Sequence, residues 1–117
     1  MPKPRLKITH DADIVEVRFL DKRILDDPAI KAISDQLFAL VEKDGNRKML
    51  LNFIGVEYLS SAAFGKLINL HHKMETLEGK LIVCNVVPQI YEVFAITKLD
   101  KVFEIFPNEE AALASFK

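Results

Sequence analysis

The chain has 117 residues, half of them hydrophobic, and its 16 basic and 17 acidic residues give a formal net charge of −1. This length and composition suit one packed domain. The sequence has no basic patch of the kind that nucleic-acid-binding proteins carry, so we expect no direct nucleic-acid partner. The single cysteine, Cys84, lies in an apolar run and cannot form an internal disulfide bond, which indicates a small buried core residue.

The sequence shows no segment that would direct the chain into or across a membrane. The opening Met-Pro-Lys-Pro-Arg lacks the apolar core of a signal peptide. No apolar run approaches the roughly 18 residues that cross a bilayer. We therefore expect a cytoplasmic protein without membrane insertion.

The first two elements are predicted to be strands, Leu6 to Thr9 and Ile14 to Phe19. The second alternates, with Ile14, Glu16 and Arg18 on one face. A polar link, residues 10 to 13, joins the two runs and predicts an antiparallel hairpin. His10 in this link lies next to acidic residues, but no second histidine follows at ligand spacing, so we interpret the link as surface chemistry rather than a metal site.

The pair Ile24-Leu25 is expected to be extended, and a helix is predicted to follow it. Asp27 can cap this helix and Pro28 fits its first turn, where a missing N–H costs nothing. Gly45 can end it in the left-handed conformation. The buried face is predicted from the apolar residues Ile30, Ile33, Leu37, Leu40 and Val41.

The middle of the chain reads as a buried strand, Lys48 to Phe53, a loop and a helix. Apolar residues recur every three to four positions after the loop, which keeps one face of a helix apolar. They are Ala63, Leu67, Leu70, Met74 and Leu77. Ser60 suits the N-cap of this helix, and Ser61 would be its first residue, with its hydroxyl outward. His71 and His72 on this helix point about 100° apart, so they cannot easily share a metal.

The last third of the chain predicts a strand at Lys80 to Cys84, a short helix opened by Val86-Val87-Pro88, and a strand at Val102 to Phe106. A final helix would be capped by Asn108, with acidic residues in its first turn. In the short helix the candidates for burial are Ile90, Val93, Phe94 and Ile96. The final helix is predicted to include Ala111, Ala112, Leu113 and Phe116. The order β-β-α-β-α-β-α-β-α predicts one α/β domain over residues 1–117, with a mixed, mostly parallel sheet and four helices.

The Ser60-Ser61 pair permits two interpretations. A helix N-terminus carries a partial positive charge and free N–H donors, so it can hold the negative charge of a phosphoryl group. The pair is therefore either a plain serine cap or the site of a phosphorylation switch.

Motifs of the common enzyme classes are missing. The four glycines are isolated, and the sequence has no CxxC, HExxH or GxSxG motif. We therefore expect no catalytic residues, no cofactor and no metal. An enzyme remains an open alternative, since a site can assemble from distant segments.

The run Leu50 to Leu67, Leu-Leu-Asn-Phe-Ile-Gly-Val-Glu-Tyr-Leu-Ser-Ser-Ala-Ala-Phe-Gly-Lys-Leu, resembles the signature of the STAS domain, the family of bacterial anti-sigma-factor antagonists. The stretch Ile96 to Leu113 is similar to the closing segment of that family. The order of elements matches along essentially the whole chain. The resemblance implies a STAS-like fold and a binding switch in transcription regulation rather than an enzyme.

In that family the unmodified domain binds an anti-sigma factor that is also a serine kinase, and so frees the sigma factor. Phosphorylation of a serine at the start of the central helix ends the binding, and a serine phosphatase resets it. The resemblance therefore implies Ser61 as the phosphoacceptor, with Ser60 as the alternative, and a partner surface at Leu59, Ser60, Ser61 and Phe64. Ser60 stands where the family pattern has aspartate, and Ala63 where it has glycine. For Phe64, ordinary core packing is the alternative role.

A second hypothesis keeps the fold without phosphorylation. The chain would then be a STAS scaffold, or a subunit of a stress-signalling or lipid-transport complex. In either case we expect a monomer or a weak dimer.

Overall fold

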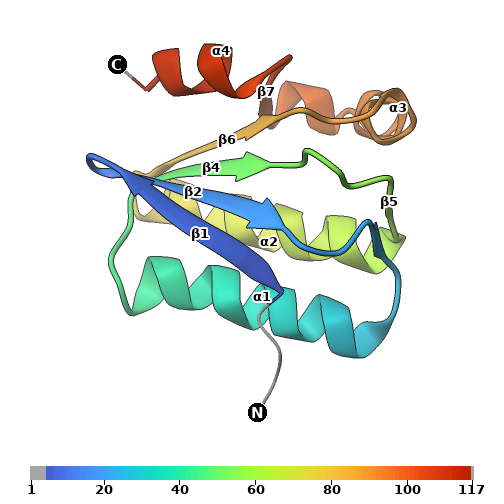
Figure 1. The fold of residues 1–117 in the computed structure, drawn as a ribbon, viewed down its shortest axis with the longest axis horizontal. Coiled ribbons are helices and arrows are strands. Elements are labelled where there is room, and N and C mark those ends of the chain that lie inside the picture. Colours follow the sequence, from blue (N-terminus) through green and yellow to red (C-terminus); the bar gives the residue numbers. More distant parts are fainter. Residues whose placement is uncertain (1–4, 117) are drawn as a thin grey trace.

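The computed structural model describes residues 5–116 of the chain. These residues are built around a five-stranded sheet (Figure 1). The strands lie in the order β1-β2-β4-β6-β7, with β1 antiparallel to β2 and every other neighbouring pair parallel. Their bounds are Leu6–Asp11 for β1, Ile14–Phe19 for β2, Lys48–Asn52 for β4, Lys80–Cys84 for β6 and Glu104–Phe106 for β7. The predicted hairpin and the predicted mixed, mostly parallel sheet are confirmed.

Helices cover both faces of this sheet (Figure 1). The long helices α1 (Asp27–Glu42) and α2 (Ser61–Thr76) lie on one face, over the larger apolar core. The short helix α4 (Glu109–Ala114) lies on the opposite face, over a smaller cluster that includes Ile82, Cys84 and Phe116. Helix α3 (Pro88–Ile96) and the 3-10 helix η1 (Leu99–Lys101) connect β6 to β7.

A second, two-stranded sheet lies beside the carboxyl ends of the main strands. Strand β3 (Arg23–Ile24) pairs in parallel with β5 (Tyr58–Leu59). The sequence predicted an extended Ile24 but no strand at Tyr58, because a two-residue strand has no periodicity of its own. This small sheet brings the segment before α1 alongside the segment before α2.

The start of α1 differs by one residue from the prediction. Asp26, and not Asp27, is the N-cap: its backbone is extended, and its Oδ2 accepts a hydrogen bond from the Ala29 N–H at 3.3 Å. Asp27 is already the first helical residue, ahead of Pro28. Both aspartates can cap a helix, so the sequence could not choose between them. The left-handed Gly45 after this helix is confirmed, with φ +72°.

The region after β6 departs further from the prediction. The last strand begins at Glu104 rather than Val102, because Val102 is the C-cap of η1 and its N–H donates to the Leu99 carbonyl. The Phe103 side chain is buried in the core. Of the residues expected to be buried in α3, Ile90 and Phe94 are buried, but Val93 is 37% exposed and Ile96 is 73% exposed. The helix is only nine residues long and lies at the margin of the molecule, so only one narrow face meets the core.

Within the described residues, no helix has both the length and the apolar character needed to cross a membrane. The first four residues of the opening Met-Pro-Lys-Pro-Arg lie outside the described part of the chain.

Candidate functional site

The N-terminus of α2 has the geometry predicted for it. Ser60 is the N-cap, with extended backbone, and its Oγ accepts a hydrogen bond from the Ala63 N–H at 3.3 Å. Its carbonyl accepts the first helical hydrogen bond, from the Phe64 N–H at 3.1 Å. The Ser60 hydroxyl therefore has a structural role as the cap of the helix.

Ser61 is the first residue of α2, and it is exposed. Its hydroxyl belongs to the first turn, where backbone N–H groups are not yet used by the helix and the helix dipole favours negative charge. The structure thus separates the two serines: Ser60 supports the helix, and Ser61 is accessible at its tip.

The loop before the serines is held firmly by main-chain hydrogen bonds. The Glu57 N–H donates to the Lys22 carbonyl at 2.7 Å, and the Ser60 N–H donates to the Ile24 carbonyl at 3.0 Å. Both acceptors belong to the segment that forms β3. This segment therefore fixes the position at which Ser61 emerges.

The two apolar residues of the predicted partner surface are mainly core residues. Leu59 and Phe64 are each 7% exposed. The Phe64 ring packs edge-on against Phe94 of α3, with centroids 5.2 Å apart. A partner could reach only a small part of these two side chains, so their main contribution is to support the exposed serine from beneath.

Two open grooves flank the first turns of α2. The groove between α2 and α3 has a volume of about 330 Å³ and is lined by Ser61, Phe64, Gly65, Ile68, Val93, Thr97 and Leu99. The groove between α1 and α2 has a volume of about 650 Å³, and its walls include Ala62 and Lys66. Ser61 therefore lies on the rim of a surface depression rather than on a flat face.

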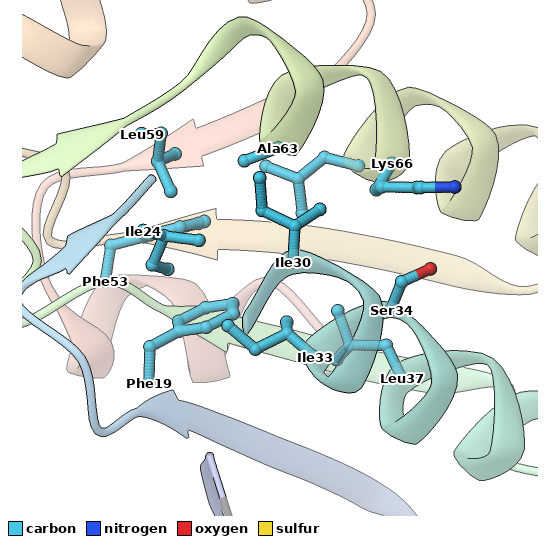
Figure 2. A pocket seen from close by; sticks show the side chains of 11 residues that line it. Phe19, Ile24, Ile30, Ile33, Ser34, Leu37, Phe53, Leu59, Ala63 and Lys66 are labelled. Carbon is cyan, nitrogen blue, oxygen red and sulfur yellow. The ribbon is translucent and has the colours of Figure 1, made fainter. Parts of the chain in front are cut away.

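A small apolar cavity lies below the site, between α1, α2 and the carboxyl ends of the strands (Figure 2). Its volume is about 20 Å³, which leaves room for about one water molecule. Ala63 lines it together with Phe19, Phe53 and Leu59, while the Lys66 amine points away from it (Figure 2). The cavity is a packing gap in the core rather than a ligand site, and the Ala63 methyl group occupies part of the space that glycine would leave empty.

A polar cluster that local sequence patterns do not predict lies on the opposite face of the sheet. Asn52 at the end of β4 is fully buried, and Glu16 on β2 is 6% exposed. They meet Arg18 of β2 and Glu109 of α4, whose carboxylate accepts from the Arg18 Nη2 at 2.7 Å. This hydrogen bond is the main reason why the pKa of Glu109 is lowered. Two hints were present in the sequence: the placement of Glu16 and Arg18 on one face of their strand, and the polar residue Asn52 inside an otherwise apolar run.

The remaining candidates bring no ligand set together. Among residues 5–116, no three His, Cys, Asp or Glu side chains are placed to hold a metal ion. His71 contacts the Phe103 ring, with centroids 5.1 Å apart, so it borders the core, while His72 is exposed. Cys84 is fully buried, and burial raises the pKa of its thiol to about 12.

Comparison with solved structures shows similar folds. The chain superimposes on an anti-sigma-factor antagonist (STAS) domain protein from Planctomyces limnophilus with a TM-score of 0.83 and 24% identity, covering 96% of this chain and 97% of that one. It also superimposes on the phosphorylated form of SpoIIAA from Bacillus with a TM-score of 0.75 and 18% identity, covering 96% and 99%. At these identities the likeness concerns the fold.

Sequence comparison gives the family. The chain is 32% identical over 82 residues to BtrV of Bordetella bronchiseptica, which is named as a candidate anti-sigma factor antagonist, and the match covers 70% of each chain. The STAS domain model matches residues 7–112, nearly the whole described chain. The protein belongs to the STAS domain family.

Proposed function

We propose that the protein is an anti-sigma-factor antagonist that binds an anti-sigma factor with serine kinase activity and is switched off by phosphorylation of Ser61. The observation that carries this proposal is the exposed Ser61 hydroxyl at the N-terminus of α2, beside a hydroxyl that already serves as the cap. BtrV, named as a candidate antagonist of this class, supports the partner class. The protein itself would act by binding and not by catalysis.

Exposed apolar side chains in the segments that follow the parallel strands support a protein-binding role. Parallel strands end at one edge of their sheet, so the residues that follow β2, β4 and β6 gather at the end of the molecule where α2 begins (Figure 1). Several large hydrophobic residues in these segments are exposed, among them Leu20, Leu25, Ile54, Tyr58 and Tyr91. Exposed apolar groups that gather in one place mark interaction sites more often than scattered ones do.

Phosphorylation would change this surface without disturbing the fold. A phosphoryl group adds about 1.5 to 2 negative charges at neutral pH, and the N-terminus of α2 can accept them. A partner packed over Ser61 would have to remove water from this charge or place its own negative charge close to it, which is repulsive. The penalty is on the order of a few kcal/mol, which corresponds to about a hundredfold in affinity.

A mass measurement tests the phosphoacceptor. The protein is incubated with ATP and the anti-sigma serine kinase encoded nearest to its gene, and then weighed intact. We expect a gain of about 80 Da for the native chain and for Ser60→Ala, and no gain for Ser61→Ala. A gain that survives in Ser61→Ala and disappears in Ser60→Ala would move the acceptor to Ser60.

A second candidate function is a STAS scaffold, or a subunit of a stress-signalling or lipid-transport complex, that is not phosphorylated. The serine at position 60 and the alanine at position 63, where the family pattern has aspartate and glycine, favour it. No mass gain with any anti-sigma kinase, together with binding to such a kinase that Ser61→Glu leaves unchanged, would support the scaffold and contradict the switch.

A further inference from the structure

The side chain of Asn52 uses its full hydrogen-bonding capacity in a fully buried position. Its Nδ2 donates to Glu16 Oε2 at 3.0 Å and to Glu109 Oε2 at 3.2 Å. Its Oδ1 accepts from the Ile54 N–H and from Asn85 Nδ2, each at 3.0 Å. An amide with partners on both its oxygen and its nitrogen has one orientation available, so each of these bonds helps to hold the others.

These four bonds join Asn52 to four separate parts of the fold. Glu16 belongs to β2, and Glu109 is the first residue of α4. Ile54 lies in the loop that leads to Ser60, and Asn85 directly follows β6. Further along this loop the Val56 N–H donates to the Phe53 carbonyl at 2.9 Å. With the bonds to the β3 segment, the backbone is anchored at short intervals from Asn52 to Ser60.

We propose that Asn52 is a positioning residue for the loop that presents Ser61, and that α4 tightens this loop through Glu109. The role of the loop as a switch rests on the proposed function. The coupling between α4 and the loop is a property of the fold and stands without it.

The physical argument concerns what happens when Glu109 is removed. One Asn52 N–H then loses its charged acceptor, and hydrogen bonds to charged groups are stronger than those between neutral groups. The amide is less firmly oriented, so its Oδ1 holds the Ile54 N–H less well. Local opening of the loop becomes more frequent, although α1 and the body of the sheet keep their contacts.

Hydrogen exchange of individual backbone amides tests the coupling, with Glu109→Ala compared to Glu110→Ala. Both residues are acids in the first turn of α4, so both substitutions remove the same favourable charge at the helix N-terminus. Glu110 is exposed, and it does not make the hydrogen bonds that Glu109 makes with Arg18 and Asn52. We expect Glu109→Ala to speed exchange in residues 53–60 by about tenfold, and Glu110→Ala to leave it near the native rate.

Two further variants sharpen the test. Glu109→Gln keeps a neutral acceptor oxygen for Asn52 and should slow exchange in the loop relative to Glu109→Ala. Asn52→Asp keeps the oxygen that the Ile54 N–H needs but cannot donate, and it faces two carboxylates, so it should speed exchange in the loop by at least as much as Glu109→Ala.

Equal loop exchange in Glu109→Ala and Glu110→Ala would overturn the proposal. So would a uniform rise over all slowly exchanging amides, because that would report only a loss of global stability. The measurement needs neither kinase nor partner. Its failure would therefore leave the proposed phosphorylation of Ser61 standing, and a failed phosphorylation would leave the coupling standing.

Discussion

Arg18 Nη2 and Glu109 Oε2 lie 2.7 Å apart although 91 residues separate them in the chain. The pair attaches the first turn of α4 to β2, and the Arg18 Nε also contacts Glu16 at 3.4 Å. Two carboxylates thus share one guanidinium, and the donors of Asn52 stabilise the remaining negative charge. Helix α4 is therefore attached to the sheet by a charged cluster as well as by apolar contacts.

This pair predicts how stability depends on pH. The hydrogen bond from Arg18 is the main cause that lowers the pKa of Glu109 in the folded protein. A lowered carboxyl pKa stabilises the fold above the unfolded-state value, about 4.3 for glutamate, and this contribution is lost as the pH falls through the lower folded value. We expect the free energy of unfolding to fall as the pH drops below about 5, and to fall less in Glu109→Gln. Urea unfolding at several pH values measures both curves, and parallel curves would contradict the assignment.

Features that depend on neighbouring residues could be predicted from the sequence. Features that depend on contacts between residues far apart in the chain could not. The caps at Ser60 and Asn108 were predicted correctly, because a cap depends on a few neighbouring residues. The alternation of β2 correctly placed Glu16 on the same face as Arg18. The burial of Glu16 depends on α4, which lies far along the chain, and no local pattern carries that information.

The same distinction applies to the candidate site. The position of Ser61 at the start of α2 follows from local signals, and the structure agrees with them. The near-complete burial of Leu59 and Phe64 depends instead on β3 and on Phe94 of α3. The exposure of Ile96 likewise depends on where α3 lies relative to the core, so its apolar character alone gave the wrong prediction.

The cap of α2 should be worth a measurable amount of stability. Ser60→Ala removes the side-chain acceptor of the Ala63 N–H, and the loss of such a cap costs about 1 kcal/mol. Ser61→Ala is the matched control, because Ser61 is exposed and is not the cap, so its effect should stay within about 0.5 kcal/mol. Urea unfolding of the two variants measures the difference. Equal stabilities would mean that the Ser60 hydroxyl does not stabilise the helix.

Two glycines should respond in opposite directions to alanine. A Cβ at Gly79, between α2 and β6, would lie 2.9 Å from Met74 Cε and 3.0 Å from the Arg47 carbonyl oxygen. The methionine can move but the backbone cannot do so cheaply, so we expect Gly79→Ala to destabilise the protein by about 1 to 3 kcal/mol. A Cβ at Gly65, within α2, meets nothing within 4 Å, and Gly65→Ala should stabilise the helix by up to about 1 kcal/mol. Thermal unfolding would show the two melting temperatures moving apart, and a shift in the same direction would contradict this account.

The thiol of Cys84 should be inert as long as the protein is folded. The side chain is fully buried, and burial raises its pKa to about 12, so the reactive thiolate is scarce at pH 8. An exposed thiol with a pKa near 8.5 would carry about a thousandfold more thiolate. We therefore expect iodoacetamide to label the folded protein only through unfolding, and to label it at the rate of a free thiol in denaturing urea. Rapid labelling of the native chain would show that the cluster around Cys84, under α4, opens far more often than its packing implies.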